Sequence, residues 1–579
     1  MTYNRVMKRY VLFLLILILG TTPARAFQIP PTTLQIAQTQ TTIQAARFSE
    51  VIRVGIGNQA FSSYVYKTIG IYGTGTLELY GGNKLVQSFP ANTNINISIN
   101  PDLTYTLKKD DGTEVGKLAA PISFKCPSGL LGVKGLKRAG LPALYRGSLD
   151  IVKSSSGVQF NLVNKLEVEE YLKGVVPNEM PIRFGLEALK AQSVAARNYV
   201  LSPRTKASPN YDVVDSVASQ VYFGANTEKD LSNQAVAQTE GTVALYNWDL
   251  ILAQYSSTAG GYTESYSHAF SDPVTKAFPS PEKPYLKAKP DILSQKSLRS
   301  EEAAKDYYKS TPDAYDIRSP YFRWTREWQA NELKNILEQT LVAQSATGFV
   351  KPAFNKGDKL DTLTELKVVR RGDSGKIVEM EVKTQTQTYK VFKELVVRRL
   401  LTKDGKALPS ANVIFENAQD NEGNLVSVKA FGGGFGHGVG MSQFGAGFMG
   451  SELHLGYDKI LQHYYSGIIL GTKPVVVSGN STQNNVAQNF YANKKFANIV
   501  VDNKYQVSTL DVNINGKDYT FRLPTSIFGG NRCDRINISD YIKVGHNRIV
   551  FKYPTGEGIN KGIKLFVELV EKNDNDSIW

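Results

Sequence analysis

The spacing of apolar residues between positions 186 and 201 predicts an amphipathic helix. Four alanines in this stretch are strong helix formers and would let a neighbouring element approach closely. The positions that recur at three- and four-residue steps, the spacing of one helix face, are Leu186, Leu189, Ser193, Val194, Arg197 and Val200. We therefore predict a well-packed helix over this stretch.

Glu179 lies shortly before this helix and is the first candidate for chemistry. Pro177 and Pro181 bracket it, and proline restricts the preceding residue and suits the first turn of a helix. We expect Glu179 at the start of the helix, beside Met180 and Phe184. Partial burial there would raise the pKa of the carboxyl, as a general acid near neutral pH requires. The alternative is a capping or solvated glutamate.

Arg197 is the second candidate, and it lies on the predicted helix itself. It follows Glu179 by about five helical turns, which is too far for direct pairing along one straight helix. We therefore expect the Arg197 guanidinium to face a ligand that lies along a groove.

Apolar and polar residues alternate with a period of two in other regions, which predicts strands. Short β-prone runs separated by turn residues fill positions 58–125, and Asp111-Gly112 is a hairpin signal. Similar runs return from position 497. We expect a β-rich subdomain at about 58–125 and a β-sandwich at 495–572, for which carbohydrate binding rests on analogy of fold alone.

The length of 579 residues exceeds what one hydrophobic core supports, so we expect several domains. The main domain is expected at 48–470. Residues 471–494 are rich in Ser, Asn and Gln and are expected to form a linker. Helical and strand-rich parts in separate stretches predict an α+β fold with a C-terminal all-β domain.

The first residues have the pattern of an export signal. A basic segment is followed by a short apolar run, and Ala24-Arg25-Ala26 is a small-x-small cleavage site. We expect a signal peptide at 1–26, a linker at 27–47, and a protein exported to the periplasm or cell wall. No other stretch is long and apolar enough to span a bilayer, so no stable transmembrane segment is expected after cleavage.

Charge and cysteine content narrow the partners. The net charge of +14 suits anionic polymers of the cell envelope. Nucleic acid is a poor alternative, because the protein is expected to leave the cytoplasm and shows no nucleic-acid motif. Cys126 and Cys533 are the two cysteines, and the five histidines form no cluster with them at metal-ligand spacing. We expect no metal and no cofactor.

Three later stretches carry further candidates. Residues 219–224 contain Gln220, and residues 256–264 combine adjacent glycines with hydroxyl side chains. Residues 431–446 form a glycine-rich loop, which lacks the Lys-Ser/Thr of a phosphate-binding loop. His437 either lines a groove or only holds its loop through a backbone hydrogen bond. The candidates for ligand contacts in the last two stretches are Ser256, Gly260, Gly261, Thr263, His437, Ser442 and Gln443.

These stretches together resemble the SpoIID/LytB family. EYLKGVVPNEMP followed by EALKAQSVAARNYVL carries the likeness, and QVYxG, SxxGGxT and GxGHGVGMSQxGA follow in family order. The resemblance covers about 51–466. It implies that Glu179, the Glu of the Glu-Met pair, is a catalytic acid/base.

The resemblance implies two functions. One is a lytic transglycosylase that cleaves peptidoglycan glycan strands with one Glu and leaves 1,6-anhydro-muramic ends. The other is a non-catalytic glycan-binding enhancer of an N-acetylmuramoyl-L-alanine amidase, as in the LytB branch. A degenerate structural envelope protein is a third, weaker option. Asp215 is a candidate second carboxylate, with a turn-capping role as its alternative.

Overall fold

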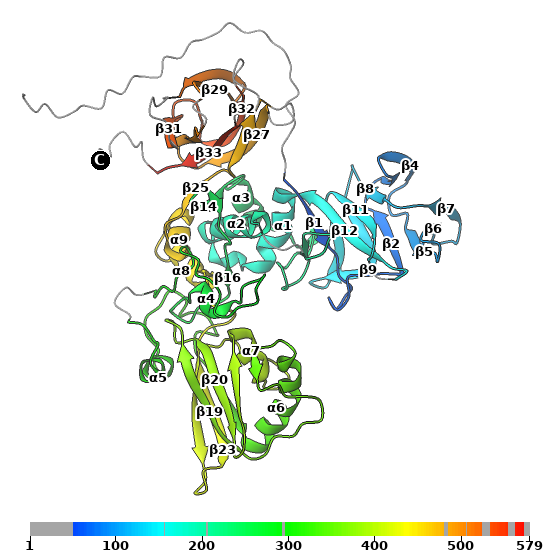
Figure 1. The fold of residues 1–579 in the computed structure, drawn as a ribbon. Helices are drawn as coiled ribbons and strands as arrows, with labels where there is room; N and C mark the ends of the chain where they lie inside the picture. Colours follow the sequence, from blue (N-terminus) through cyan, green and yellow to red (C-terminus); the bar gives the residue numbers. More distant parts are fainter. Residues whose placement is uncertain are drawn as a thin grey trace, which may run out of the picture.

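The computed structural model describes residues 50–155, 157–203, 207–291, 296–479, 484–504, 507–523, 533–553 and 562–571. A helical centre joins a β-rich N-terminal part, an α/β unit and a β-rich C-terminal part (Figure 1). The mixed α+β character expected from the sequence is confirmed. The expected signal peptide at 1–26 and linker at 27–47 lie outside the described residues. None of the described helices has the length and apolar character of a membrane span.

The N-terminal part consists of two sheets with a common hydrophobic core. It extends beyond the expected 58–125, because strands up to position 167 pair with it. The seven-stranded sheet has the order β13-β1-β12-β11-β8-β3-β4 and the six-stranded sheet β10-β9-β2-β5-β6-β7. Their bounds are β1 Val51–Gly55, β2 Thr68–Gly73, β3 Leu77–Gly81, β4 Lys84–Phe89, β5 Ile95–Ile99, β6 Tyr105–Lys109, β7 Glu114–Leu118, β8 Ile122–Lys125, β9 Leu131–Arg138, β10 Leu141–Tyr145, β11 Ser148–Lys153, β12 Phe160–Glu167 and β13 Val213–Val214.

The helical centre is built around α2 (Leu186–Leu201), which confirms the helix expected from the apolar spacing. Its small residues let other helices pack closely, and 12 of its 16 residues are buried. The surrounding elements are α1 (Val168–Glu179), the 3-10 helices η1 (Ile182–Phe184) and η2 (Ala225–Thr227), α3 (Asp230–Ala237), α4 (Tyr266–Ala269), α8 (Gln443–Ser451) and α9 (Tyr457–Tyr464).

The position expected for Glu179 was wrong in one respect. It is the last residue of α1, a helix of its own, and it does not begin α2. Pro177 lies inside the last turn of α1, and Met180 adopts an extended conformation that ends the helix. The chain then needs η1 before α2 begins. Glu179 therefore lies at a corner between two helices, where several loops converge.

The α/β unit has its own core, formed mainly by α6 packed against two small sheets. Figure 1 shows it below the helical centre. One sheet has the order β18-β21-β20-β19 and the other β17-β23-β22. The bounds are α5 Glu301–Lys309, β17 Trp324–Gln329, α6 Ala330–Ser345, β18 Val350–Lys351, β19 Leu363–Arg371, β20 Ile377–Thr384, β21 Thr388–Phe392, α7 Glu394–Leu400, β22 Val413–Gln419 and β23 Leu425–Gly432.

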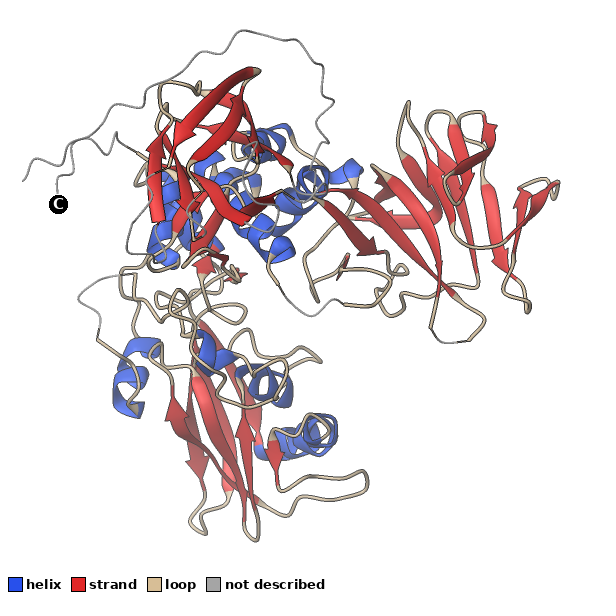
Figure 2. Ribbon diagram, turned by 45° about the horizontal axis from the view of Figure 1, so that its top comes forward, coloured by secondary structure: helices blue, strands red, loops and turns tan. Residues whose placement is uncertain are grey.

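The C-terminal part is built largely of strands, drawn in red in Figure 2. They form two sheets around one core, one of order β27-β32-β29-β30 and one of order β15-β14-β25-β33-β28-β31 in which β26 also pairs with β33. β14 and β15 come from the helical centre, so one sheet is continuous between the helical centre and the C-terminal part. The bounds are β14 Val243–Tyr246, β15 Asp249–Leu250, β25 Ile469–Gly471, β26 Val475–Ser478, β27 Asn485–Ala492, β28 Ala497–Asp502, β29 Thr509–Ile514, β30 Lys517–Arg522, β31 Cys533–Asn537, β32 Gly545–Lys552 and β33 Gly562–Leu569.

The expectation of a linker at 471–494 was wrong, because strands β26 and β27 occupy much of this segment. Val477 and Phe490 are fully buried in the C-terminal core. The polar composition of the segment hides an alternation in which every second side chain points inward.

Candidate active site

Glu179 is held by two distant parts of the chain. Its carboxyl Oε1 accepts a hydrogen bond of 2.6 Å from the backbone N–H of Val221. Its backbone carbonyl accepts one of 2.9 Å from the side-chain amide of Gln443. The corner after α1, the 220–224 stretch and the start of α8 therefore meet at Glu179.

The environment of Glu179 keeps its carboxyl protonated near neutral pH. Burial raises the pKa of Glu179 to about 7, while the hydrogen bonds from Val221 and Gln443 pull it down. No charged side chain of the described chain contributes to this shift. A group that titrates near 7 without an ion-pair partner can both give and take a proton, which is the requirement for an acid/base catalyst.

Gln220 is buried beside this site, and its side chain contacts only other parts of the described protein. Its side chain is buried, and its amide oxygen accepts a hydrogen bond of 3.1 Å from the Tyr171 hydroxyl. Its amide nitrogen donates to the Tyr255 hydroxyl at 3.0 Å and to the Ala196 carbonyl at 3.4 Å. These internal partners fix the backbone next to Val221. The expectation that Gln220 binds substrate is replaced by a positioning role.

The two glycine-rich stretches lie side by side. Strand β16 (Tyr255–Ser256) pairs in parallel with β24 (Met441–Ser442), and an antiparallel bridge joins Thr258 to Phe435. The Ser256 hydroxyl accepts a hydrogen bond of 3.2 Å from the backbone N–H of Gly438. Their pairing carries Gln443, the residue after β24, to Glu179.

Asp316 fastens these two stretches together, and sequence reasoning missed it. Its Oδ2 accepts hydrogen bonds from the backbone N–H groups of Ala259 at 2.7 Å and Gly260 at 2.8 Å, and from the Ser442 hydroxyl at 3.1 Å. Burial, with Asp291 nearby, raises the pKa of Asp316 to about 7. Ser442, expected to contact substrate, is itself buried in this clamp. Nothing in the sequence around Asp316 signals the role, since its partners are far away in the chain.

The glycines and the threonine of the 256–264 loop serve chain packing. Gly260 and Gly261 have φ values of +82° and +91°, which favour glycine. A Cβ on Gly260 would lie 2.9 Å from the Gly433 carbonyl carbon, and one on Gly261 would lie 2.3 Å from the Tyr307 hydroxyl. The Thr263 hydroxyl donates to the Lys289 carbonyl at 3.1 Å. Close approach of protein segments, and not of a ligand, explains these residues.

His437 holds its own loop, in agreement with the second of its two interpretations. Its Nδ1 accepts a hydrogen bond of 3.1 Å from the backbone N–H of Val439. Burial and the nearby charges of Lys376 and Arg398 lower the pKa of His437 to about 3, so the ring stays neutral. A neutral ring that packs against Phe270, with centroids 5.1 Å apart, is a structural element.

Arg197 does not lie beside Glu179. Its buried guanidinium forms a two-point ion pair with Glu169, at 2.8 and 2.6 Å, and donates to the Thr242 carbonyl at 3.0 Å. Glu169 and Glu179 are ten residues apart on α1, about 15 Å along the helix. The expected ligand contact of Arg197 is thus taken by an internal carboxylate at the far end of α1.

Asp215 is likewise engaged by the protein. Its carboxylate forms a buried ion pair of 2.7 Å with Arg138 and accepts a hydrogen bond of 3.1 Å from the backbone N–H of Gly57. Both oxygens thus have internal partners. Asp215 therefore offers no free carboxylate to a reaction at Glu179.

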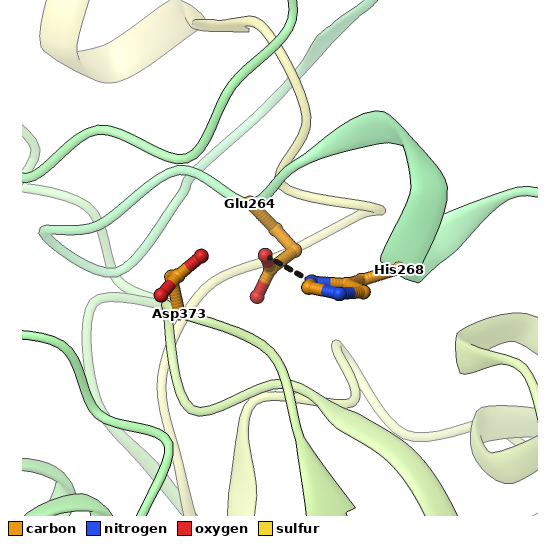
Figure 3. A group of neighbouring side chains, drawn as sticks. All are labelled: Glu264, His268 and Asp373. Carbon is orange, nitrogen blue, oxygen red and sulfur yellow. Dashed lines mark hydrogen bonds and ion pairs between the residues drawn. The ribbon is translucent and has the colours of Figure 1, made fainter. Parts of the chain in front are cut away.

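Glu264, His268 and Asp373 form a cluster whose ligand atoms lie within 4.8 Å of one another (Figure 3). Their oxygen and nitrogen atoms are suitable for a cation, yet the carboxylates already have partners. Glu264 accepts from His268 Nδ1 at 3.0 Å and from the backbone and hydroxyl of Ser374 at 3.0 and 2.7 Å. Asp373 accepts a two-point interaction from Arg299 at 2.8 and 3.0 Å. The cluster joins the central domain to the β19–β20 turn.

Comparison with known proteins gives two family matches. The model described as SpoIID, Stage II sporulation protein, matches residues 156–246, which contain Glu179 and Gln220. The model described as Domain of unknown function (DUF8618) matches residues 272–440, which include the α/β unit. The SpoIID match thus covers the corner where Glu179 lies.

Curated relatives cover about half of the chain. The Amidase enhancer of Bacillus subtilis (strain 168) is 31% identical over 300 residues, 52% of this chain and 40% of that protein. Stage II sporulation protein D of the same organism is 30% identical over 321 residues, 53% of this chain and 74% of that protein. Stage II sporulation protein D of Bacillus amyloliquefaciens is 29% identical over 322 residues, 53% of this chain and 74% of that protein.

Proposed function

The chain belongs to the SpoIID/LytB family, and we propose that it is a peptidoglycan lytic transglycosylase with Glu179 as its single acid/base. A cell-wall-related role follows from the family; the cleavage chemistry is the proposal. The observation that supports it most is the pKa of about 7 at a partly buried carboxyl without an ion-pair partner.

The proposed reaction uses one carboxyl group twice, first as an acid and then as a base. The protonated Glu179 carboxyl donates to the glycosidic oxygen, and the bond between that oxygen and C1 of the muramic sugar breaks. The resulting carboxylate then accepts the proton of the muramic C6 hydroxyl. The C6 oxygen bonds to C1 in the same step. The products are a free 4-hydroxyl and a 1,6-anhydro end, and no water is consumed.

Three other buried acids near the signature stretches support a single-carboxylate scheme. Hydrolytic glycosidases generally use two carboxylates that flank the scissile bond. Asp215 is paired with Arg138, Asp316 binds backbone N–H groups, and Glu264 is saturated by hydrogen bonds. A second carboxylate is not required when the C6 hydroxyl of the substrate is the nucleophile.

The alternative function is a non-catalytic glycan-binding enhancer of an N-acetylmuramoyl-L-alanine amidase. The similarity to a protein named Amidase enhancer favours this option. Glu179 would then only hydrogen-bond a sugar. In both functions the partner is the peptidoglycan glycan strand, and we propose that the protein is exported to the periplasm or cell wall, where its net charge of +14 attracts anionic polymers.

Product analysis distinguishes the two functions. The chain from Phe27 onward would be incubated with glycan strands that keep or lack their stem peptides, beside the Glu179→Gln variant. Mass spectrometry should find anhydro ends with the wild type and none with the variant. Ends that carry added water would indicate a hydrolase. Absence of cleavage with intact binding in both proteins would contradict the enzyme and leave the amidase enhancer.

A further inference from the structure

Two aromatic rings on the surface are unlike all others in the described part of the chain. Among its Phe, Tyr and Trp residues, only Tyr321 and Phe435 are exposed, at 37% and 39%. These two rings stack on each other, with centroids 4.3 Å apart and planes inclined by 28°. We propose that this pair is a sugar-stacking subsite for the glycan strand, an inference that rests on the proposed function.

The backbone holds the pair in place before any ligand binds. The N–H of Gly434 donates to the Tyr321 carbonyl at 2.8 Å, which joins the two segments next to the rings. Phe435 exchanges two backbone hydrogen bonds with Thr258, at 2.9 and 3.2 Å. Gly434 has a φ of +90°, and a Cβ there would lie 2.8 Å from the Thr258 carbonyl oxygen. A preformed platform loses little conformational entropy when a sugar binds.

The Tyr321–Phe435 pair lies next to the β16–β24 pairing, a short ladder of hydrogen bonds that leads to Glu179. Thr258, which is bridged to Phe435, lies two residues beyond Ser256, and Ser256 pairs with Ser442. Two residues along a strand span about 7 Å. The next residue, Gln443, binds the backbone carbonyl of Glu179. A polymer bound over Glu179 can thus reach the pair without leaving the two signature stretches.

Half-buried aromatic residues occupy the helix that starts at this ladder. Phe444 and Phe448 are four residues apart on α8 and lie on one face. Phe448 stacks with Tyr315 at 5.9 Å, and the Arg318 guanidinium lies 5.6 Å from the Phe448 ring. α8 thus adds half-buried aromatic faces next to the ladder, and the Arg318 guanidinium also forms an ion pair of 2.7 Å with Glu452.

A sugar fits the pair better than a protein partner does. The C–H face of a pyranose ring is apolar and stacks on an aromatic ring, while its hydroxyl groups remain in water. Protein interfaces need larger apolar patches, usually several hundred Å² or more. Every other described aromatic ring is half-buried or buried, so two exposed rings are too few for such a patch and suit a ligand as small as a sugar.

Binding measurements in a non-cleaving protein test the subsite. Peptide-free glycan strands would be titrated into the Glu179→Gln chain by calorimetry, with Tyr321→Ala and Phe435→Ala added one at a time. Each should weaken binding about tenfold, the loss of one stacked ring. Tyr321→Phe, which keeps the ring, should bind as the parent does. Circular dichroism would verify that each variant is folded.

The outcomes separate this inference from the proposed function. Equal affinity of the parent and both folded alanine variants would overturn the subsite and leave the proposed function standing. If the alanine variants kept their affinity for glycan but no longer stimulated an amidase, the pair would be a protein-docking surface and the subsite would be overturned. Absence of glycan binding by the parent itself would overturn both.

Discussion

Glu179 and Glu264 are two glutamates near the signature loops, and their surroundings differ. The Glu264 side chain is fully buried, and each of its carboxylate oxygens accepts two hydrogen bonds, from groups that include His268 and Ser374. The Glu179 carboxyl has the Val221 N–H as its close donor, and Glu179 remains partly exposed. One carboxylate is locked in the protein and the other retains free lone pairs.

The comparison shows that burial alone does not identify a catalytic acid. The carboxylate oxygens of Glu264 are all occupied by internal donors and offer no lone pair to a substrate. The Glu179 carboxyl has few donors, and burial raises its pKa to about 7. We expect the incompletely bonded glutamate to do chemistry and the saturated one to hold two domains together.

The largest expected effect is on glycan cleavage by Glu179→Gln. The amide keeps the size of the side chain but can neither donate a proton to the glycosidic oxygen nor accept one from the C6 hydroxyl, so the rate should fall by a factor of about 10²–10⁴. Quantifying anhydro ends by mass spectrometry measures it. Glu170→Gln is the matched control, because it lies on the same helix and forms only surface ion pairs with Arg146 and Lys173. Equal loss in both variants would contradict a special role of Glu179.

The converse change, Glu264→Gln, should act on stability. The amide NH₂ group would face N–H and O–H donors of Ser374 or the ring of His268, which leaves buried donors unpaired. We expect the free energy of unfolding to fall by about 4 kcal/mol. Urea denaturation measures this loss. A variant as stable as the wild type would mean that Glu264 is not the fastening point that its hydrogen bonds indicate.

The sequence was sufficient to find Glu179 because its evidence is local. The flanking prolines, the apolar neighbours and the Glu-Met motif all lie within a few residues. The helix α2 is predictable for the same reason, since its apolar spacing is regular. The exact place of Glu179, at the end of one helix, was not predictable because α1 tolerates Pro177 in its last turn.

The partners of the other candidates are set by long-range contacts that sequence reasoning cannot see. Arg197 pairs with Glu169, 28 positions away, and Ser442 binds Asp316, 126 positions away. A polar residue in a motif can therefore be wholly internal to the fold. The strands within 471–494 were missed because tertiary burial, and not composition, decides which residues face the core.

The raised pKa of Glu179 should make the stability of the protein depend on pH. A carboxyl with a pKa of 4.5 when unfolded and about 7 when folded binds more protons in the folded state between these pH values. The free energy of unfolding must therefore decrease as the pH rises from 4.5 to 7, by about 3 kcal/mol from Glu179. The Glu179→Gln variant has no carboxyl at this position, so its free energy of unfolding should not show this decrease.

The measurement is a pair of urea denaturation series at pH 4 and pH 8. The two proteins should be equally stable at pH 4, and the variant should be more stable by about 3 kcal/mol at pH 8. Greater stability of the wild type at pH 8 would mean that the Glu179 carboxylate is stabilised by the fold. That outcome would contradict the raised pKa of Glu179 and the contrast with Glu264.

The smallest expected effect is a shift of the pH profile of cleavage in Gln443→Ala. Gln443 lowers the pKa of Glu179, so its removal should raise that pKa by about half a unit, the worth of a modest hydrogen bond. Cleavage requires the protonated acid and declines above its pKa. The alkaline limb of kcat/KM should therefore move to higher pH, while Gln462→Ala, an exposed residue of α9, should leave it unchanged. A shift to lower pH would show that Gln443 favours the neutral carboxyl, and a lower rate with no shift would assign Gln443 to holding the corner after α1 through the Glu179 carbonyl.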